Sequence, residues 1–457
     1  MSHLPTPLIE SLIHITGFDR DAFVRVHESG EQITSVRLNP LKVSPGDVLF
    51  PSVEKIPWSS YGYYLPERPS FTFDPLFHAG LYYVQEASGM FVEQALRQTM
   101  DLSQPLRVLD LCAAPGGKST LLQSLVSNDS LLVSNEVIKS RVHLLEENMT
   151  KWGAANTVVT NNDPKDFARL ENYFDVIVID APCSGSGLFR RDPGAIREWS
   201  EGNVQLCHQR QQRILADVWP ALKQGGVLIY STCSYSKEED EDILDWITAE
   251  LGADSKKLDI SAYPGIVETV SEKKEAWGYR FYPDKIKGEG FFAAALQKQE
   301  GGEWGGIRLK RGGLEKVSKM EAQQAARWLR TVDDTILFKQ KEDIIALPPY
   351  FETDIPALQS ALYLKKAGVL MGKPTAKELV PEHALALSGL LNPELVSIPL
   401  NKEQAIQYLR RDELHPDTNY RGWALVDYRG YRLGWVKVLA NRVNNYYPKE
   451  WRILKAP

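Results

Sequence analysis

The stretch FDVIVIDAPCSGSG, residues Phe174–Gly187, contains the pattern that decides the fold. Val176–Ile179 is a short apolar run, typical of a strand that is buried on both faces in the middle of a parallel sheet. The run ends in Asp180 and, three residues later, Cys183, which small flexible residues follow. An acid and a thiol at the carboxyl end of a central strand stand where open α/β sheets bind ligands. The stretch by itself therefore suggests Cys183 as a catalytic nucleophile.

Apolar strand-like segments alternate with helical segments on both sides of this stretch. The sequence predicts strands at Arg107–Cys112, Leu131–Glu136, Thr157–Thr160, Val176–Asp180 and Gly226–Cys233, with helices that include Lys139–Trp152 and Val204–Leu222. Strands separated by helices imply right-handed crossovers. We therefore expect an α/β fold with a doubly wound, mostly parallel sheet.

Length and composition indicate a soluble protein of several domains. At 457 residues the chain is too long for one hydrophobic core, and about three domains are expected. No apolar run approaches the ~20 residues needed to cross a bilayer. The amino terminus lacks the basic region and cleavage site of a signal peptide. We therefore expect a cytoplasmic protein without membrane contact.

The cysteines carry information about the compartment and about metals. They are widely spaced along the chain, at Cys112, Cys183, Cys207 and Cys233. This spacing fits reduced thiols rather than a disulfide framework, and no Cys-x-x-Cys pair indicates zinc. We expect no metal.

The carboxyl terminus differs in charge from the rest of the chain. The net charge is −6, yet eight Lys or Arg residues follow position 420, opposed only by Asp427 and Glu450. Seven aromatic residues are interleaved with them. This asymmetry is expected of a module that binds a polyanion. A small β-barrel whose aromatics fill its own core is an equally good interpretation.

Composition shifts divide the chain into four segments. Residues 1–78 are expected to form a small α+β accessory domain, and residues 79–299 the catalytic domain. Residues 300–375 would hold a linker, with the glycine-rich stretch Gly301–Gly313, and a small intermediate domain. Residues 376–457 would form the basic C-terminal domain.

A ligand loop is expected within Leu109–Ser119, LDLCAAPGGKS. Gly116 and Gly117 let the backbone approach a ligand, and the start of the following helix offers free N–H groups. The ending Gly-Lys-Ser resembles a P-loop. However, Cys112 stands where a P-loop requires glycine, and Pro115 lacks one N–H donor. A nucleotide triphosphatase is therefore a weak alternative.

Carboxylates accompany three successive predicted strands, at Asp110, Glu136 and Asp163. In nucleotide-binding sheets an acid at the position of Glu136 binds ribose hydroxyls, and Asp163 is placed to reach an adenine edge. The G-x-G-x-x-G pattern of dinucleotide sites is absent, so NAD fits poorly. A nucleoside ligand without pyrophosphate, such as S-adenosylmethionine, fits the loop better.

Three motifs together carry a resemblance to a known family. CAAPGGK (Cys112–Lys118), DAPCSG (Asp180–Gly185) and STCS (Ser231–Ser234) resemble the RNA 5-methylcytosine methyltransferases of the Nol/Nop/Sun (NSUN) family. The resemblance extends from about Gly80 to Lys298. The N-terminal segment and the PUA-like tail are further similar to the bacterial RsmF-type 16S rRNA subgroup.

The resemblance implies a Rossmann-like class I methyltransferase that uses S-adenosylmethionine and no metal. It assigns nucleophilic attack to Cys233, product release to Cys183 and activation of the base to Asp180. It further implies a cofactor site built from Cys112, Ala113, Ala114, Pro115, Gly116, Gly117, Lys118, Glu136, Asp163 and Asp180. The implied substrate is 16S rRNA or the small ribosomal subunit, with tRNA as the main rival, and a monomer is expected.

The chemistry of cytosine explains why two thiols are useful. If the strands that precede Cys183 and Cys233 are neighbours, their ends lie ~5 Å apart. A thiolate that adds to carbon-6 makes the unreactive carbon-5 nucleophilic, and an acid at ring N3, such as Asp180, assists the addition. The target base must leave its stack to reach such a pocket. Spacing alone does not rank the two thiols. A catalytically silent RNA-binding protein is the remaining alternative.

Overall fold

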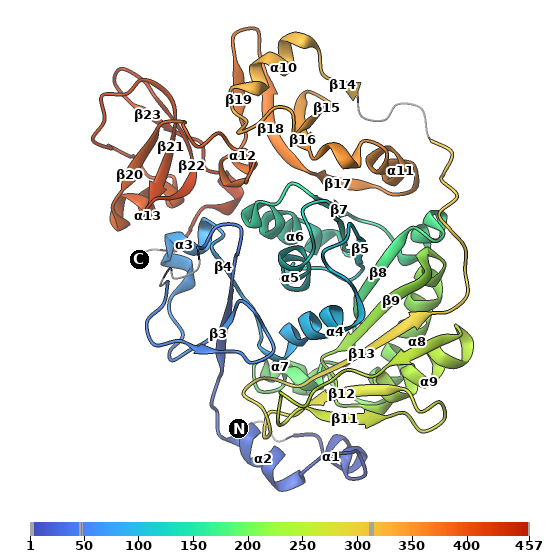
Figure 1. The fold of residues 1–457 in the computed structure, drawn as a ribbon. Helices are drawn as coiled ribbons and strands as arrows, with labels where there is room; N and C mark the ends of the chain where they lie inside the picture. The colour runs from blue at the N-terminus through green and yellow to red at the C-terminus, as the bar shows by residue number, and fades with distance from the viewer. Residues whose placement is uncertain (1–3, 45–46, 48, 310–314, 456–457) are drawn as a thin grey trace.

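The computed structural model describes residues 4–44, 47, 49–309 and 315–455. A large central sheet with helices on both faces forms the middle of the molecule, and smaller sheets adjoin it (Figure 1). The prediction of a Rossmann-like α/β fold with additional N-terminal and C-terminal domains is confirmed. None of the helices in the described part of the chain is both long enough and apolar enough to cross a membrane.

The central sheet is parallel in its middle and antiparallel at both edges. Its strand order is β11 (Val267–Val270), β12 (Trp277–Phe281), β13 (Phe291–Lys298), β9 (Leu222–Thr232), β8 (Phe174–Asp180), β5 (Arg107–Asp110), β6 (Leu131–Asn135), β7 (Thr157–Thr160) and β17 (Leu364–Ala367), with β10 (Ala253–Lys256) paired to β13. The strands β5, β6, β7, β8 and β9 are the parallel ones. The strand order reverses between β5 and β8, and open sheets bind ligands at this reversal.

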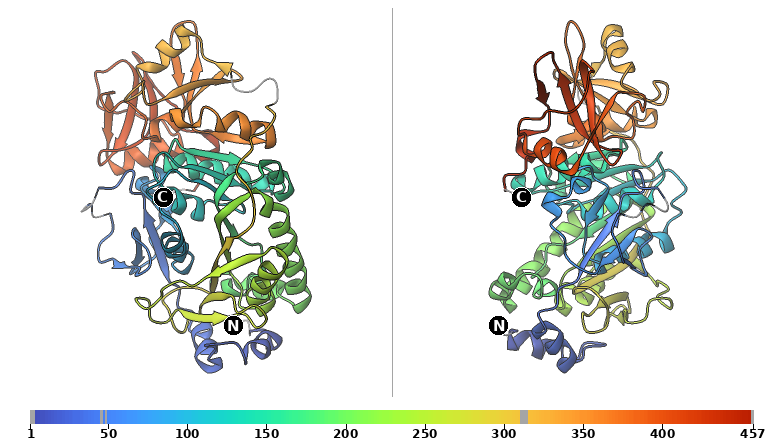
Figure 2. Two further views of the ribbon diagram at one scale, coloured as in Figure 1. Left: turned by 45° about the vertical axis from the view of Figure 1, so that its right-hand side comes forward. Right: turned by 90° about the vertical axis from the view of Figure 1, so that its left-hand side faces the viewer.

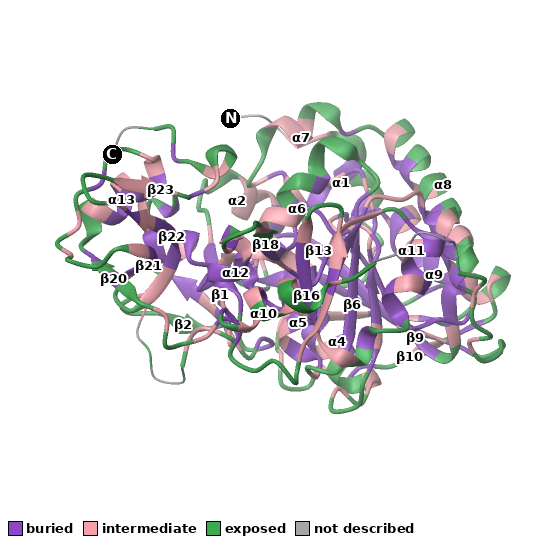
Figure 3. Cartoon of the chain, turned by 90° about the horizontal axis from the view of Figure 1, so that it is seen from above, coloured by how far each residue is buried: buried purple, intermediate pink, exposed green. Residues whose placement is uncertain are grey.

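Both faces of the sheet are covered, which explains the continuous apolar run in β8. Ile177 and Ile179 point into one buried cluster, and Val176 and Val178 point into the other. The strands are buried while the outer sides of the helices are exposed (Figure 3). The covering helices are α4 (Val92–Thr99), α5 (Gly117–Leu125) and α6 (Lys139–Trp152) on one face, and α8 (Glu201–Val218), α9 (Glu241–Glu250) and the 3-10 turn η3 (Pro164–Leu170) on the other.

The N-terminal segment has two separate parts. Strands β2 (Glu54–Lys55), β3 (Gly62–Leu65), β1 (Thr34–Leu38) and β4 (Tyr82–Val84) form an antiparallel sheet, and the short helix α3 (Pro75–His78) lies between β3 and β4 in the chain. The boundary expected after residue 78 crosses this sheet, because β4 pairs with β1. Helices α1 (Thr6–Leu12) and α2 (Arg20–Glu28) lie at the far end of the molecule (Figure 1).

The segment expected as an intermediate domain is shared with its neighbours. Its sheet contains β14 (Glu315–Lys316), β15 (Ile336–Gln340), β16 (Asp343–Leu347), β18 (Val369–Pro374) and β19 (Leu379–Pro381), with helices α10 (Lys319–Ala326), α11 (Asp354–Ala361) and α12 (His383–Leu387) nearby. The boundary expected after residue 375 separates β18 from β19, although the two strands pair. Strand β17 leaves this segment and completes the central sheet against β7. Part of the predicted linker, residues 310–313, lies outside the described residues.

The C-terminal domain is a small sheet that lies beside the N-terminal one (Figure 2). It consists of β20 (Ser397–Leu400), β21 (Gly422–Tyr428), β22 (Tyr431–Val438) and β23 (Val443–Asn445), with helix α13 (Lys402–Arg410). Trp423, Trp435 and Tyr447 are buried here. These three aromatics therefore fill the core and cannot stack on bases at the surface.

Candidate functional site: two cysteines at adjacent strand ends

The two cysteines that follow β8 and β9 lie in contact. The strands are parallel neighbours, with Asp180 opposite Ser231, and the loops beyond them are joined by a hydrogen bond of 2.9 Å from the Gly187 N–H to the Cys233 carbonyl. The Sγ atoms of Cys183 and Cys233 are 2.9 Å apart. Both are free thiols. Residues 50 positions apart in sequence thus present two sulfur atoms to one place.

The two sulfurs differ in their environment. The hydrogen bond to Cys233, together with burial, raises the pKa of the Cys183 thiol well above its ordinary value. Cys183 therefore keeps its proton at neutral pH, next to the sulfur of Cys233. Because the thiolate is the nucleophilic form of cysteine, a pair in hydrogen-bond contact can offer one sulfur as nucleophile beside a proton-bearing neighbour.

An ion pair connects the cysteine loops to the predicted ligand loop. Lys118 Nζ lies 2.6 Å from Asp180 Oδ2, and Ser231 Oγ donates a hydrogen bond of 2.9 Å to Asp180 Oδ1. Burial alone would lower the pKa of Lys118, but its acidic neighbours, with Asp180 first among them, together outweigh burial, so the pKa is raised and the lysine stays charged. The carboxylate of Asp180, over a third exposed, is thereby fixed at the end of β8.

The ligand loop has the open backbone that the sequence suggested. Gly116 has φ 113°, a left-handed conformation that favours glycine, and α5 begins at the next residue. Side chains of α6 hold the loop: Arg141 Nη2 donates to the Ala114 carbonyl at 2.6 Å, and Asn148 Nδ2 donates to the Pro115 carbonyl at 2.8 Å. Burial raises the pKa of Cys112, so this third thiol is protonated and serves packing.

The three carboxylates predicted beside this loop lie along one edge of the sheet. Asp110 is fully buried at the end of β5 and accepts a hydrogen bond of 2.6 Å from Ser119 Oγ. Glu136 follows β6 and accepts from the Ile138 N–H at 2.8 Å. Asp163 follows β7, where it caps η3 through the Lys165 N–H. All of them stand where successive parallel strands end, and Asp163 also lies 3.6 Å from Arg213 Nη1 on α8.

Sequence reasoning missed Glu239, which joins the two cysteine loops. Its carboxylate accepts from the Ser184 N–H at 2.7 Å, from Ser184 Oγ at 2.6 Å and from Ser234 Oγ at 2.5 Å. Ser184 follows Cys183 and Ser234 follows Cys233. The acidic run Glu238–Asp242, close behind the STCS motif, was the only sign of this role in the sequence.

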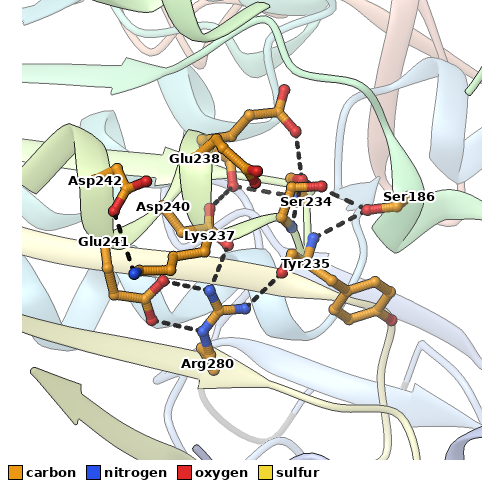
Figure 4. A network of polar contacts seen from close by, with 12 residues as sticks. Ser186, Ser234, Tyr235, Lys237, Glu238, Asp240, Glu241, Asp242 and Arg280 are labelled. Carbon is orange, nitrogen blue, oxygen red and sulfur yellow. Dashed lines mark hydrogen bonds and ion pairs between the residues drawn. The ribbon is translucent and has the colours of Figure 1, made fainter. Parts of the chain in front are cut away.

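A second polar network supports the loop after Cys233 (Figure 4). Arg280, buried on β12, donates to Glu241 and to the Tyr235 carbonyl, the latter at 2.9 Å, and lies 3.2 Å from Asp240. The Tyr235 N–H in turn donates to Ser186 Oγ at 2.9 Å. A buried arginine with carboxylate and carbonyl partners fixes its surroundings, since losing any partner would strand a charge.

The described residues include no group of three or more His, Cys, Asp or Glu side chains that could hold a metal ion. Cys207 and His208 lie on α8, beside the Glu238–Glu239 segment that supports the cysteine loops. Cys207 is buried, and His208 Nδ1 lies 2.5 Å from the Glu238 carbonyl oxygen.

Three family models match the chain in the order of its domains. The description "N-terminal domain of 16S rRNA methyltransferase RsmF" matches residues 4–87, and "16S rRNA methyltransferase RsmB/F" matches residues 97–297. The description "Methyltransferase RsmF PUA domain" matches residues 396–453. The first range contains β4, which agrees with a domain border beyond residue 84.

Curated relatives are similar over almost their whole length. Ribosomal RNA small subunit methyltransferase F of Shewanella loihica is 30% identical over 437 residues, which cover 91% of this chain and 88% of the relative. The protein of the same name from Aeromonas salmonicida is 30% identical over 443 residues, 91% of this chain and 90% of the relative.

Solved structures share the fold of the central part. A methyltransferase homologue from Pyrococcus horikoshii is 28% identical, with a TM-score of 0.52, and covers 65% of this chain and 100% of its own. NSun6 from the same organism, 18% identical with a TM-score of 0.54, covers 65% of this chain and 99% of its own, and shows the fold alone. The motifs, the domain order and the full-length relatives agree, and the chain belongs to the RsmF family of 16S rRNA methyltransferases.

Proposed function

We propose that the chain methylates carbon-5 of a cytosine in 16S rRNA, with S-adenosylmethionine as methyl donor. The observation that carries this proposal is the 2.9 Å contact between Cys183 and Cys233 beside the Lys118–Asp180 ion pair. A pair of thiols suits covalent catalysis on a pyrimidine ring, in which one sulfur bonds to the substrate and is later expelled. We further propose a monomer that works in the cytoplasm on RNA of the small ribosomal subunit.

The residues around the ligand loop fit the proposed donor. Gly116 and Gly117 offer backbone without side chains, and Oδ1 of Asp110 is a buried oxygen without a hydrogen-bond partner in the described part of the chain. An edge rich in carboxylates suits a ligand with a positively charged sulfur and ribose hydroxyls. We assign the ribose hydroxyls to Glu136 and the adenine edge to Asp163. The bound donor supplies an electrophilic methyl group.

The chain's own groups then account for activation of the base. The Cys233 thiolate bonds to carbon-6, which turns the C5–C6 double bond into an enamine whose carbon-5 is nucleophilic. The carboxyl group of Asp180, when it carries a proton, donates a hydrogen bond to ring N3 and so stabilises the electron-rich ring. Lys118 Nζ, 2.6 Å from Asp180 Oδ2, holds the carboxyl group in place.

Release of the product reverses the addition. Once carbon-5 carries the methyl group, a base removes the carbon-5 proton, the double bond reforms and the bond from carbon-6 to Cys233 breaks. The electron pair of that bond returns to Cys233 as a thiolate. The protonated thiol of Cys183, in hydrogen-bond contact with this sulfur, stabilises the leaving thiolate.

Two cysteine variants test the proposed roles. Cys233→Ala should abolish methyl transfer, by at least roughly 10³-fold, and should form no RNA adduct that survives denaturing electrophoresis. Cys183→Ala should bind RNA covalently but release it slowly, so adducts should accumulate. Labelled methyl transfer and gel analysis measure both effects, with the exposed Ser261→Ala as control. Adducts with Cys233→Ala but none with Cys183→Ala would invert the assignment.

The substrate and the cofactor need separate tests. Bisulfite sequencing of rRNA and tRNA from a deletion strain should show a lost 5-methylcytosine in 16S rRNA, and a loss confined to tRNA would contradict the substrate assignment. Thermal unfolding should show stabilisation by S-adenosylmethionine and none by ATP. Stabilisation by ATP alone would favour a nucleotide triphosphatase. Absence of methyl transfer would favour a catalytically silent RNA-binding protein.

A further inference from the structure

A cavity of about 290 Å³ lies where four parts of the chain meet. Its walls come from the loop after β1, the end of α6 at Trp152, the end of α12 at Leu387 and the turn between β21 and β22. In Figure 1 these elements surround the junction between the N-terminal sheet and the C-terminal domain. The volume is at the small end of ligand sites, which span ~300–1,000 Å³. None of the cysteine-site residues lines it.

The charges that line this cavity are all positive. Lys42, Arg330 and Arg432 contribute three cations, and its lining includes no carboxylate. Lys42 is fixed in place, because its Nζ donates to the carbonyls of Ala79 at 2.8 Å and Lys151 at 2.6 Å. Asp47 lies near the rim, where it accepts a hydrogen bond of 2.9 Å from the Tyr431 hydroxyl.

The two arginines have no partner within the described residues. Neither the Arg330 nor the Arg432 guanidinium takes part in an ion pair or a side-chain hydrogen bond there. Burial lowers the pKa of Arg432, and the nearby charge of Arg330 lowers it further. Burial likewise lowers the pKa of Lys42 to about 7, with Arg432 as the second cause. Like charges held close together without a counter-ion destabilise the fold, and an anion in the cavity would relieve this cost.

We propose that this cavity binds a backbone phosphate of the RNA substrate through Lys42, Arg330 and Arg432. The proposal rests on the proposed function for its choice of RNA as the source of the phosphate. Planar guanidinium groups match the oxygens of a phosphate in pairs, whereas a lysine acts as a point charge. Contacts to phosphates supply most of the affinity in nucleic-acid binding and carry no sequence information.

The position of the cavity makes this a contact remote from the target base. Helix α6 begins near Glu136 and ends at the cavity, and its 14 residues span about 21 Å. The phosphate held there therefore belongs to a nucleotide several positions from the methylated cytosine. Because the C-terminal domain supplies Arg432, the same contact uses that domain to set the register of the RNA on the catalytic domain.

The test compares Arg330→Gln, Arg432→Gln and the double variant with Arg210→Gln. Arg210 is an exposed arginine on α8, and its replacement changes the charge by as much as each single variant does. Binding of 16S rRNA fragments is measured without cofactor over a series of salt concentrations. We expect each cavity variant to bind roughly tenfold more weakly. The double variant should lower the slope of log affinity against log salt by about one. In methylation assays KM should rise while kcat stays unchanged.

Stability and free phosphate provide the opposing outcomes. Because the arginines are unpaired, their removal should leave the unfolding temperature unchanged or raise it at low salt. A salt slope equal to that of wild type, with or without a loss of stability, would overturn the proposal. A second result would also overturn it: inorganic phosphate stabilises wild type but not Arg432→Gln, while the salt slope for RNA is unchanged. The cavity would then bind free phosphate. If wild type fails to methylate RNA, the proposed function is contradicted instead. The salt slopes of RNA binding still test whether the cavity binds a phosphate of the RNA.

Discussion

At the scale of single residues, the cysteine site depends on which groups keep their protons. Cys183 is protonated because its partner is another sulfur, and Lys118 is charged because Asp180 is its partner. Asp110 is a third case, a carboxyl group without contact to solvent. Burial raises its pKa to about 7 against the opposing effect of the Ser119 hydrogen bond, and Lys118, Asp180 and Glu136 are the other charges that act on it.

This raised pKa predicts a pH dependence of stability. Between its ordinary pKa of 3.8 and about 7, Asp110 holds its proton in the folded state but loses it in the unfolded state. The stability that it contributes is thus fully present below pH 4 and lost as the pH rises through 7. The Asp110→Asn variant should lack this contribution. The difference in unfolding temperature, variant minus wild type, should therefore increase as the pH rises from 4 to 7.

Calorimetry across that range, with the exposed Asp129→Asn as matched control, measures the difference. A constant offset between Asp110→Asn and wild type at every pH would show that Asp110 ionises normally. The same experiment bears on the ligand loop, because Asp110 anchors Ser119 in the first turn of α5.

At the scale of elements, the loops after β8 and β9 act as one unit because Glu239 holds both. We expect Glu239→Gln to lose acceptor capacity toward Ser184 and Ser234, at a cost of about 1–3 kcal/mol in free energy of unfolding. The sulfur atoms would then be less well aligned, so kcat should fall while KM changes little.

Glu238→Gln, at the neighbouring and less buried position, is the control for this prediction. Steady-state kinetics and the yield of covalent RNA adduct separate positioning from simple stability, because a merely destabilised enzyme keeps its kcat per folded molecule. Normal kcat in Glu239→Gln would show that the loops hold their places without this bridge.

The elements themselves were largely predictable from the sequence. Helix α6 and strand β7 have the predicted bounds, because their hydrophobic periodicity and flanking residues are local signals. The predicted helix Val204–Leu222 instead starts at Glu201, where Ser200 caps it, and ends before a 3-10 turn. Helix ends depend on capping contacts, which periodicity does not report.

At the scale of the whole molecule, the domains share cores instead of standing apart. Phe338, Ile345 and Leu358 of the intermediate segment belong to the same buried cluster as Leu228 of the central sheet. Arg107 Nε at the start of β5 lies 2.9 Å from Asp354 Oδ1 on α11. These contacts explain why boundaries drawn from composition crossed two sheets.

A truncated chain tests this sharing. The fragment 1–299 should unfold at a lower temperature than the full chain and should aggregate, because it exposes both this cluster and the edge of β7 that β17 covers. The fragment 1–395, which keeps β17, is the control and should stay more soluble. Thermal unfolding and size-exclusion chromatography measure both properties. Equal unfolding temperatures for fragment 1–299 and the full chain would show that the catalytic domain is independent.

The sequence by itself determined the alternation of strands and helices, the loop with Gly116 and the placement of the acids and cysteines at strand ends. Periodicity and turn-forming residues act over a few positions, so they can be read from the chain. Only the tertiary structure decided that Cys183 touches Cys233, that Glu239 joins their loops and that Lys42, Arg330 and Arg432 share a cavity. Such contacts join residues tens to hundreds of positions apart, and they exist only once the strands have paired and the domains have packed.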